Sequence, residues 1–254
     1  VDDVGLDQRL QPGARRRRAR RDAQLLAAEG SRVAVMGRTR TDVDAAVNRL
    51  RADGGTAIGV CADVTQADQT DDALRRVRDE HGPPLIVVGQ AIYQRPGDFA
   101  DIDDVNVYRE SFEAYTISQI LLLKTVLPAM QDAQWGRFVH IGSATAKEPA
   151  GYIHHVVANA TRPSTVGLLK TVSDEYALYG ITVNTVAPGW IETENAIAYI
   201  DRNIGETDAE QRRKFMLGEA RVPAGRMGKP HEIASLIAYL CSDAAGYITG
   251  AWIE

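Results

Sequence analysis

Two apolar segments of the sequence are each followed by residues that could bind a small polar ligand. Ser143 follows the segment FVHIG, and a serine hydroxyl there can hydrogen-bond a substrate carbonyl or close a turn. Pro188, Gly189, Ile191 and Thr193 follow the segment ITVNTVA. Gly189 would let the backbone approach a flat ligand, and Thr193 could hydrogen-bond a carboxamide.

Charged residues follow two further apolar segments. Arg38 and Arg40 come after RVAVM, and in a dinucleotide-binding fold this turn meets the adenosine ribose. A guanidinium offers a fixed fork of donors, so these arginines favour the 2′-phosphate of NADP(H) over the hydroxyl of NAD(H); the alternative is a solvated turn. Asp63 and Val64 come after AIGVCA, where the carboxylate can accept from an adenine amino group or close a turn.

The elements that must position these residues alternate along the chain. Nearly continuous apolar runs are typical of strands buried on both faces, so they predict an α/β fold of the doubly wound Rossmann type, a parallel sheet with helices on both faces. Ligands bind such sheets beyond the carboxyl ends of the strands. The predicted strands are 32–36, 57–62, 84–88, 138–142 and 181–187, and the predicted helices are about 41–51, 67–80, 105–131, 163–178 and 230–242.

The remaining segments complete this prediction. Gly30 is expected to end a helix that precedes the first of these strands. Residues 190–228 suggest an irregular excursion that holds the substrate specificity, and the last eight residues have strand character. Neither an internal repeat nor a linker is visible, so we interpret residues 1–254 as one domain.

Composition narrows the classes of function. The chain has 254 residues, 44% of them hydrophobic, and a net charge of −5, which argues against a nucleic-acid-binding protein. Its two cysteines give neither a metal-binding spacing nor a disulfide framework. We expect no bound metal, no membrane span, no secretory signal and a cytoplasmic location.

Three long segments carry a resemblance to a known family. WGRFVHIGSATA, YGITVNTVAPGWIETE and RVPAGRMGKPHEIASLIAYLCSDAAGYITG resemble the classical short-chain dehydrogenase/reductases, and most of all the 3-oxoacyl-carrier-protein reductases. The likeness runs from about residue 24 to 254. It implies a bound NADP(H), hydride transfer between the cofactor and a carbonyl or alcohol substrate, and a homo-tetramer or dimer.

The sequence departs from this family at its catalytic positions. The family uses a serine, a tyrosine, and a lysine four residues after the tyrosine; Ser143 matches the serine, but Ala158 and Arg162 stand at the other two positions. Arg162 keeps the positive charge but cannot deliver a proton at neutral pH. Because Pro163 disfavours helical geometry at the residue before it, we expect the helix to begin at Pro163. Tyr115 stands near the family's asparagine, either as a replacement acid or as a buried phenol.

The missing phenol leaves other candidates for the proton donor. His154, His155 and Tyr152 lie nearby, and imidazole exchanges protons near neutral pH, so we assign His154 and His155 with Ser143 and Arg162 as catalytic candidates. A surface loop is the alternative for the histidine pair. Gly89 lies in a stretch that, in the family, shapes the wall beside the cofactor ring.

The beginning of the chain differs most from the family. Residues 1–23 lack both a β-rich strand and the glycines of the family's phosphate-binding loop, and residues 14–21 hold six arginines. An arginine run is typical of a solvated tail or a nucleic-acid contact. Runs of Arg, Ala, Pro and Gly are also typical of a GC-rich region read out of frame, which is our hypothesis for 1–23. A chain without this loop should bind the cofactor poorly.

Three functions are compatible with these residues. The first is an NADP(H)-dependent oxidoreductase that reduces a ketone, or oxidises a secondary alcohol, with an altered proton donor. The second is a non-catalytic family member that serves as a binding or partner subunit. The third is a dehydration or isomerisation that uses a histidine.

Overall fold

Seven parallel β-strands form the centre of the described part of the protein. A computed structural model describes residues 4–7, 16–89, 95–150, 153–204 and 208–254. The strands lie in the order β3-β2-β1-β4-β5-β6-β7, and all of their pairings are parallel. Their bounds are β1 Val4–Asp7, β2 Arg32–Gly37, β3 Ala57–Cys61, β4 Ile86–Gly89, β5 Gly136–Ile141, β6 Ile181–Val186 and β7 Trp252–Ile253.

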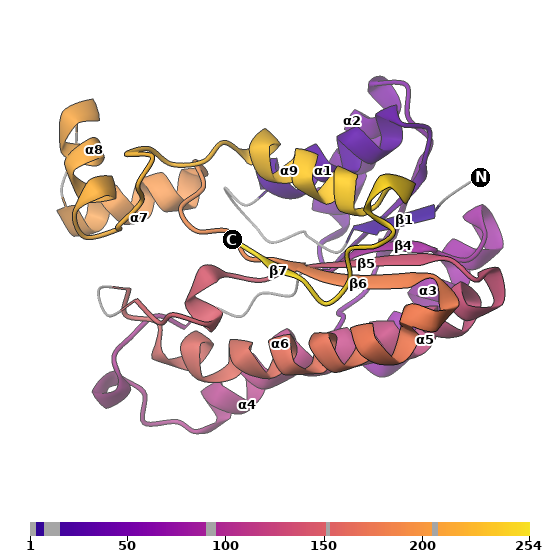
Figure 1. The fold of residues 1–254 in the computed structure, drawn as a ribbon, viewed down its shortest axis with the longest axis horizontal. Helices are drawn as coiled ribbons and strands as arrows, with labels where there is room; N and C mark the ends of the chain where they lie inside the picture. The colour runs from indigo at the N-terminus through magenta and orange to yellow at the C-terminus, as the bar shows by residue number, and fades with distance from the viewer. Residues whose placement is uncertain (1–3, 8–15, 90–94, 151–152, 205–207) are drawn as a thin grey trace.

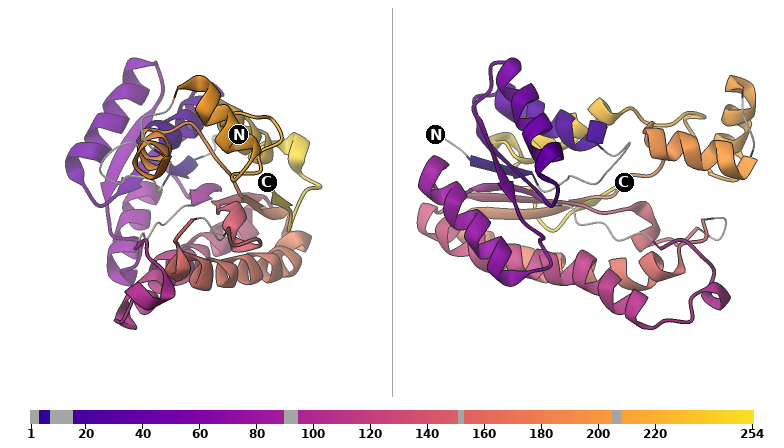
Figure 2. Two further views of the ribbon diagram at one scale, coloured as in Figure 1. Left: turned by 90° about the vertical axis from the view of Figure 1, so that its left-hand side faces the viewer. Right: turned by 180° about the vertical axis from the view of Figure 1, so that it is seen from behind.

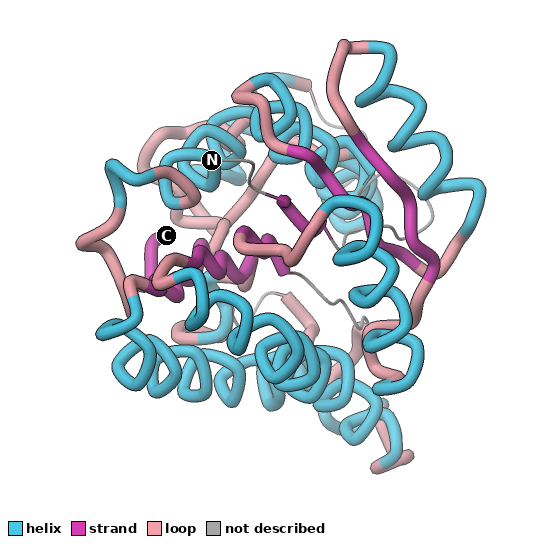
Figure 3. The backbone as a smooth tube through the Cα atoms, turned by 90° about the vertical axis from the view of Figure 1, so that its right-hand side faces the viewer, coloured by secondary structure: helices cyan, strands magenta, loops and turns pink. Residues whose placement is uncertain are grey.

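Helices cover both faces of this sheet, with α1, α2 and α9 above it and α3, α4, α5 and α6 below it in Figure 1. Figure 3, a view from one end, shows strands between helical layers. The α/β prediction is therefore confirmed. The helices are α1 Arg16–Ala28, α2 Arg40–Ala52, α3 Ala67–His81, α4 Asn106–Phe112, α5 Ser118–Ala133, α6 Val156–Tyr176, α7 Glu194–Ile204, α8 Ala209–Leu217 and α9 Pro230–Leu240.

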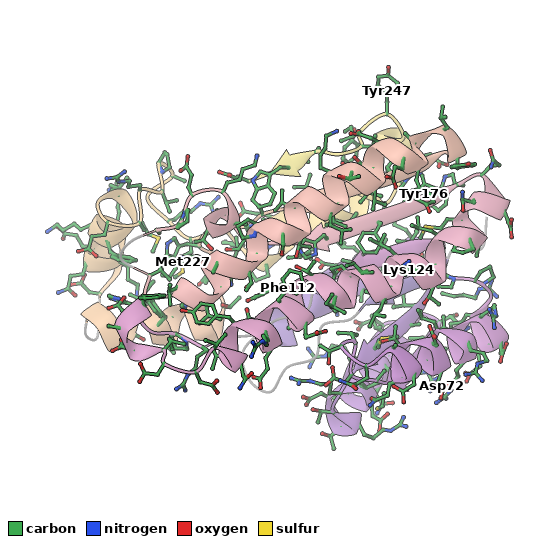
Figure 4. All side chains as sticks on the ribbon, turned by 90° about the horizontal axis from the view of Figure 1, so that it is seen from below. Asp72, Phe112, Lys124, Tyr176, Met227 and Tyr247 are labelled. Atoms are coloured by element: carbon green, nitrogen blue, oxygen red, sulfur yellow. The ribbon has the colours of Figure 1, made fainter. Side chains whose placement is uncertain are left out.

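Apolar clusters on each face of the sheet hold the layers together. Below the sheet, Val87 and Phe138 pack with side chains of α3, α5 and α6. Above it, Val88 and Ile141 pack with α1 and α9. Neighbouring residues of one strand thus face opposite layers, which is why these strands are apolar throughout. Figure 4 looks onto the lower helices, with Phe112 at the end of α4 and Lys124 on α5 labelled.

The order of the strands fixes where a ligand can bind. The chain moves outward from β1 to β2 and β3, and then returns past β1 to continue with β4, β5, β6 and β7. The carboxyl ends of β1 and β4 therefore form the topological switch point, which is where such sheets bind ligands. The predicted strands agree with β2 to β6 within two residues at each end.

The prediction that residues 1–23 contain no strand is wrong. Residues Val4–Asp7 form β1, which pairs with β2 on one side and β4 on the other. Glycine and aspartate are unfavourable in strands, so the sequence VGLD gives little local signal. Pairing on both edges supplies the missing stability. Residues 8–15, where the phosphate-binding loop would lie, are outside the described residues, and the one-domain interpretation stays a prediction.

The prediction that a helix begins at Pro163 is also wrong. Helix α6 already begins at Val156 and contains Pro163. Its first turns are fixed by packing, because Val157, Ala158 and Thr161 are buried. Thr161 also shares a hydrogen bond of 2.7 Å with Ser111 of α4. These contacts outweigh the backbone bias that a proline places on the residue before it.

Two other segments differ from their predictions: residues 190–228 are more regular, and residues 105–131 are less regular. The excursion 190–228 contains α7 and α8, which Figure 2 shows standing out at one end of the protein. The long helix predicted over 105–131 is interrupted by a π-helical turn at Glu113–Ile117. Among the described residues, none of the helices is long and apolar enough to cross a membrane.

Candidate active site

A run of hydrogen bonds joins Ser143, beyond the end of β5, to a helix below the sheet. The hydroxyl of Ser143 lies 3.1 Å from that of Thr145. Arg162 Nη1 donates to Thr145 Oγ1 at 2.7 Å, and Arg162 Nη2 donates to the phenolic oxygen of Tyr115 at 3.1 Å. The guanidinium also lies 5.1 Å from the centre of the Tyr115 ring. The structure therefore connects two predicted site residues, Ser143 and Arg162, through Thr145.

Local structure explains why these groups meet. Ser143 precedes a 3₁₀ turn, Ala144–Ala146, which places Thr145 beside the first half of α6. Arg162 is half-buried, while Tyr115 is buried in the π-helical turn. A guanidinium presents donors in a planar fork, so it can bind two oxygens at once.

Hydroxyl groups fasten the π-helical turn to α6. Thr116 shares hydrogen bonds with Ser164 at 2.6 Å and Thr165 at 3.0 Å. Thr165 Oγ1 also donates to the backbone carbonyl of Tyr115 at 2.8 Å. These bonds fix the backbone of Tyr115 relative to Arg162, which lies one turn before Thr165.

Helix α6 carries Ala158 and Arg162, the two residues matched from the sequence to the tyrosine and lysine of the family. Ala158 and Arg162 lie four residues apart on α6, so they occupy successive turns of the same face. Ala158 is buried and has no group that can transfer a proton. The structure thus places a fixed positive charge, but no phenol, at the two positions.

The histidines lie in the segment before α6. His154 is exposed, and its Nδ1 lies 2.7 Å from Asp98 Oδ1. His155 is half-buried, and its ring centre lies 6.5 Å from that of Tyr199 on α7. The observed contacts of His154 lead to Asp98 and those of His155 to α7. Tyr152 lies outside the described residues.

The charged residues beyond β2 and β3 lie close together. Arg38 Nη1 is 3.8 Å from Asp63 Oδ2, and the Arg38 side chain is 55% exposed. Asp63 Oδ1 accepts hydrogen bonds from the backbone N–H and the hydroxyl of Thr65. Arg40 begins α2 and lies 3.8 Å from Asp44 on the same helix. Val64 packs against the lower core.

The predicted residues near the ends of β4 and β6 have distinct surroundings. Gly89 is buried at the end of β4, where an added Cβ would lie 2.7 Å from Gln119 Oε1. Pro188 is buried and its carbonyl accepts from the N–H of Ala144. Gly189 is exposed, and a Cβ there would meet no atom within 4 Å. Thr193 Oγ1 accepts from the N–H of Ala196 in the first turn of α7.

An ion pair stabilises the segment that returns from the excursion. Ile191 forms an isolated bridge with Gly228. Arg226 donates two hydrogen bonds to the carboxylate of Glu232, at 2.9 and 2.7 Å, and the N–H of Lys229 donates to the same carboxylate. These bonds, first of all that from Arg226, lower the pKa of Glu232 from 4.5 to about 2.

The chemistry of these strand ends fits a phosphorylated dinucleotide. Arg38 and Arg40 offer exposed guanidinium groups, each of whose ion-pair distances is longer than a hydrogen bond. Gly189 leaves open space beside the backbone after β6. Residues 8–15, which follow β1 at the switch point, are not among those described.

Sequence reasoning gave no role to Thr145 and Asp98, and it left Tyr115 with two interpretations. Thr145 lies two residues after the predicted Ser143, and the i, i+2 spacing of two hydroxyls in SATA was the available signal. Asp98 is 56 residues from His154, so the sequence contained no sign of that pair. Tyr115 meets Arg162 only because a π-helical turn places it there.

Comparisons with known proteins agree with this fold. A family model described as enoyl-(acyl carrier protein) reductase matches residues 15–254. The 3-oxoacyl-acyl-carrier-protein reductase FabG of Salmonella typhimurium is 35% identical over 242 residues, 95% of this chain and 92% of that protein. The enzyme of the same name from Vibrio cholerae is 33% identical over 242 residues, with the same coverage.

A solved structure extends the likeness. A variant of actinorhodin polyketide ketoreductase with NADPH superposes with a TM-score of 0.83 at 29% identity, covering 99% of this chain and 95% of that one. From the matched family model, the identities and the parallel sheet, it follows that this chain belongs to the short-chain dehydrogenase/reductase family, in the branch similar to the 3-oxoacyl-acyl-carrier-protein reductases.

Proposed function

We propose that this protein is an NADP(H)-dependent oxidoreductase that reduces a ketone or oxidises a secondary alcohol. Its proton donor would differ from the tyrosine of the family, because alanine stands at position 158. The observation that carries this proposal is the hydrogen-bonded run from Ser143 through Thr145 to Arg162 at the carboxyl end of β5. It gathers a hydroxyl donor and a fixed positive charge where the sheet can bind a ligand. Relatives named as 3-oxoacyl reductases support ketone reduction.

The cofactor would be held by the residues at the strand ends. Two guanidinium groups suit the 2′-phosphate, and the NADPH in the related ketoreductase structure supports this choice. When bound, the reduced nicotinamide would supply a hydride to the carbonyl carbon. The proposed contacts are Arg38 and Arg40 for the phosphate, Asp63 and Val64 for the adenosine, and Gly89, Pro188, Gly189, Ile191 and Thr193 for the nicotinamide end.

The chain's own residues would stabilise the oxygen of the substrate. Ser143 would donate a hydrogen bond to the carbonyl oxygen, on which negative charge develops during the reaction. Arg162 would hold Thr145, and through it Ser143, and would add a positive field to the site. His154 and His155 are the candidates for the proton donor that the sequence offers. A homo-oligomeric assembly and a cytoplasmic location are further parts of this proposal.

Partner surfaces would come from helices that are only partly buried. Ile117, Ile120 and Leu121 on the π-helical turn and α5, and Val166 on α6, keep part of their apolar surface accessible. Leu169 and Val172, by contrast, belong to the core below the sheet. A homo-oligomer would therefore use the former residues.

Two measurements test the proposed function. NADPH fluorescence, titrated with the protein, reports binding of the cofactor. Loss of the reduced-nicotinamide absorbance then reports hydride transfer to a panel of ketones that includes a 3-oxobutanoyl thioester of N-acetylcysteamine. We expect both signals with NADPH and weaker ones with NADH. Absence of binding would contradict the proposal and favour a non-catalytic role, whereas binding without oxidation would favour dehydration or isomerisation.

A further inference from the structure

We infer that the phenol of Tyr115, which reaches the site from the π-helical turn, is the proton donor of the reaction. This inference rests on the proposed function and names a catalytic residue outside both the family's serine, tyrosine and lysine positions and the histidine pair. Tyr115 lies at the far end of the run of hydrogen bonds that begins at Ser143.

The contacts of the Tyr115 hydroxyl are those of a proton donor held by a cation. Arg162 Nη2 donates to the phenolic oxygen at 3.1 Å, so the hydrogen of the phenol is not the one shared in this bond. A hydrogen bond from a guanidinium also stabilises the negative charge that remains on oxygen once the proton has left. Arg162 thus serves as a positioning residue and not as the acid.

The same guanidinium ties Tyr115 to the serine that would bind the substrate. Its other terminal nitrogen donates to Thr145 at 2.7 Å, and Thr145 lies 3.1 Å from Ser143. The planar guanidinium of Arg162 therefore binds the hydroxyl oxygens of both Thr145 and Tyr115. The inference requires that a carbonyl oxygen accepting from Ser143 also lie within hydrogen-bond reach of the Tyr115 hydroxyl.

The backbone of Tyr115 has a conformation that is rare in helices. Residues Glu113–Ile117 form a π-helical turn between α4 and α5, and such turns are frequent at functional sites. The bonds from Thr165 to the Tyr115 carbonyl, and from Thr116 to Ser164, hold this turn against α6. The position of the Tyr115 backbone is therefore fixed relative to α6.

The two histidines have described contacts with Asp98 and with α7. The imidazole of His154 is exposed and paired with Asp98, and that of His155 lies beside Tyr199 on α7. The run of hydrogen bonds that begins at Ser143 leads through Thr145 and Arg162 to Tyr115.

The chemical step balances with groups already named. A reduced dinucleotide, when bound, would supply the hydride, with its two electrons, to the carbonyl carbon. The O–H bond of Tyr115 breaks as the O–H bond of the product alcohol forms, and the phenolate regains a proton from solvent. The ketone would thereby be reduced to a secondary alcohol, with the dinucleotide as the reductant.

Tyr115→Phe tests the inference, since it removes the hydroxyl and keeps the ring beside Arg162. General acid catalysis contributes about 10²–10⁴-fold, so kcat for the 3-oxobutanoyl thioester should fall at least about 100-fold. The midpoint of NADPH binding should stay within a factor of about two of the wild-type value, because the phenol holds no part of the cofactor. Tyr239→Phe, at an exposed position of α9, is the matched control and should keep wild-type activity.

Two further variants keep the outcome decisive. Tyr108→Phe removes the buried hydroxyl of another tyrosine in this helical region, which has no hydrogen-bond partner among the described residues. Wild-type kcat in Tyr115→Phe, or a loss found instead in Tyr108→Phe or His155→Ala, would overturn the inference while the proposed function stands. A wild-type protein that binds NADPH and reduces no ketone would overturn the proposed function.

A measurement that needs no turnover separates failure of the Tyr115 inference from failure of the proposed function. The infrared carbonyl stretch of the thioester probe, labelled with ¹³C at its keto carbon and bound beside NADP⁺, reports the hydrogen bonds to that oxygen. We expect the stretch to move to higher frequency in Tyr115→Phe and not in Tyr239→Phe. An unchanged stretch in Tyr115→Phe would contradict contact between the phenol and the carbonyl oxygen, whatever the rate.

Discussion

Arg162 Nη1 donates a hydrogen bond to Thr145 Oγ1 at 2.7 Å, across the gap between the loop after β5 and helix α6. The bond makes Thr145 the link between a charged side chain and the hydroxyl of Ser143. The proposed function requires this link, because an unsupported serine hydroxyl would not be fixed in the direction of a carbonyl oxygen.

Thr145→Val therefore should lower activity while leaving the cofactor site intact. A hydrogen bond with a charged partner is worth about 1.5–3 kcal/mol, so kcat should fall about 10- to 100-fold. The affinity for NADPH should not change. Thr145→Ser keeps the hydroxyl and should restore most of the activity. Equal activity of the Val and Ser variants in steady-state kinetics would show that the link has no role.

The position of Arg38 predicts a preference for NADPH over NADH. Its guanidinium lies 3.8 Å from Asp63 and is more than half exposed, so it can turn to a phosphate. Arg38→Ala should weaken NADPH binding by about 10-fold or more, the loss of a charge-assisted contact. NADH binding should change little, because it has no 2′-phosphate. Fluorescence titrations with both cofactors measure the ratio, and equal losses for the two would contradict a phosphate contact.

Pro163 provides a test of stability. It is exposed inside α6 and has no N–H to donate to the carbonyl of Asn159. Replacing proline in a helix gains about 3 kcal/mol, and the freer unfolded chain returns about 1 of it, so Pro163→Ala should raise the free energy of unfolding by about 2 kcal/mol.

Gly167→Ala serves as the control for that helix. A Cβ at Gly167 would meet no atom within 4 Å, so alanine should stabilise α6 by about 1 kcal/mol. Urea unfolding measures both variants. If Pro163→Ala lowered stability while Gly167→Ala raised it, the proline would be part of the native packing of α6.

The pair Arg226–Glu232 predicts how stability depends on pH. The hydrogen bond from Arg226 lowers the pKa of Glu232 from 4.5 to about 2 in the folded protein, so the unfolded chain takes up this proton first. The stabilisation is complete above pH 4.5 and is lost as the pH falls toward about 2. Urea midpoints of wild type and Glu232→Gln should therefore converge over that range.

Salt gives the control for this prediction. Because the pair is exposed, its contribution is small and should shrink as ionic strength rises. A difference between wild type and Glu232→Gln that stayed constant from neutral pH to pH 2 would contradict the assignment.

The sequence predicts the sheet well where strands are long and apolar. The runs around Val87 and Val183 are buried on both faces, and that burial is visible as unbroken hydrophobicity. Strand β1 escapes prediction because its four residues include Gly5 and Asp7, and its stability comes from two neighbouring strands that are distant in sequence. Local rules cannot register such pairing.

The residues of the site likewise divide into those with a local sequence signal and those that depend on distant contacts. Ser143 and Arg162 can be found from the sequence because each stands at a defined distance from a recognisable segment. The link through Thr145 and the role of Tyr115 depend on a π-helical turn and on a helix that continues through Pro163. Both follow from packing between α4 and α6, which no spacing in the sequence encodes.

The transfer of deuterium tests the central claim most directly. The protein would be mixed with a ketone and with NADPH carrying deuterium at the transferable position of its nicotinamide ring, and the product analysed by mass spectrometry. The account predicts a secondary alcohol with one deuterium on its carbinol carbon. An unlabelled product, or recovery of the ketone in a mixture where NADPH is demonstrably bound, would contradict it.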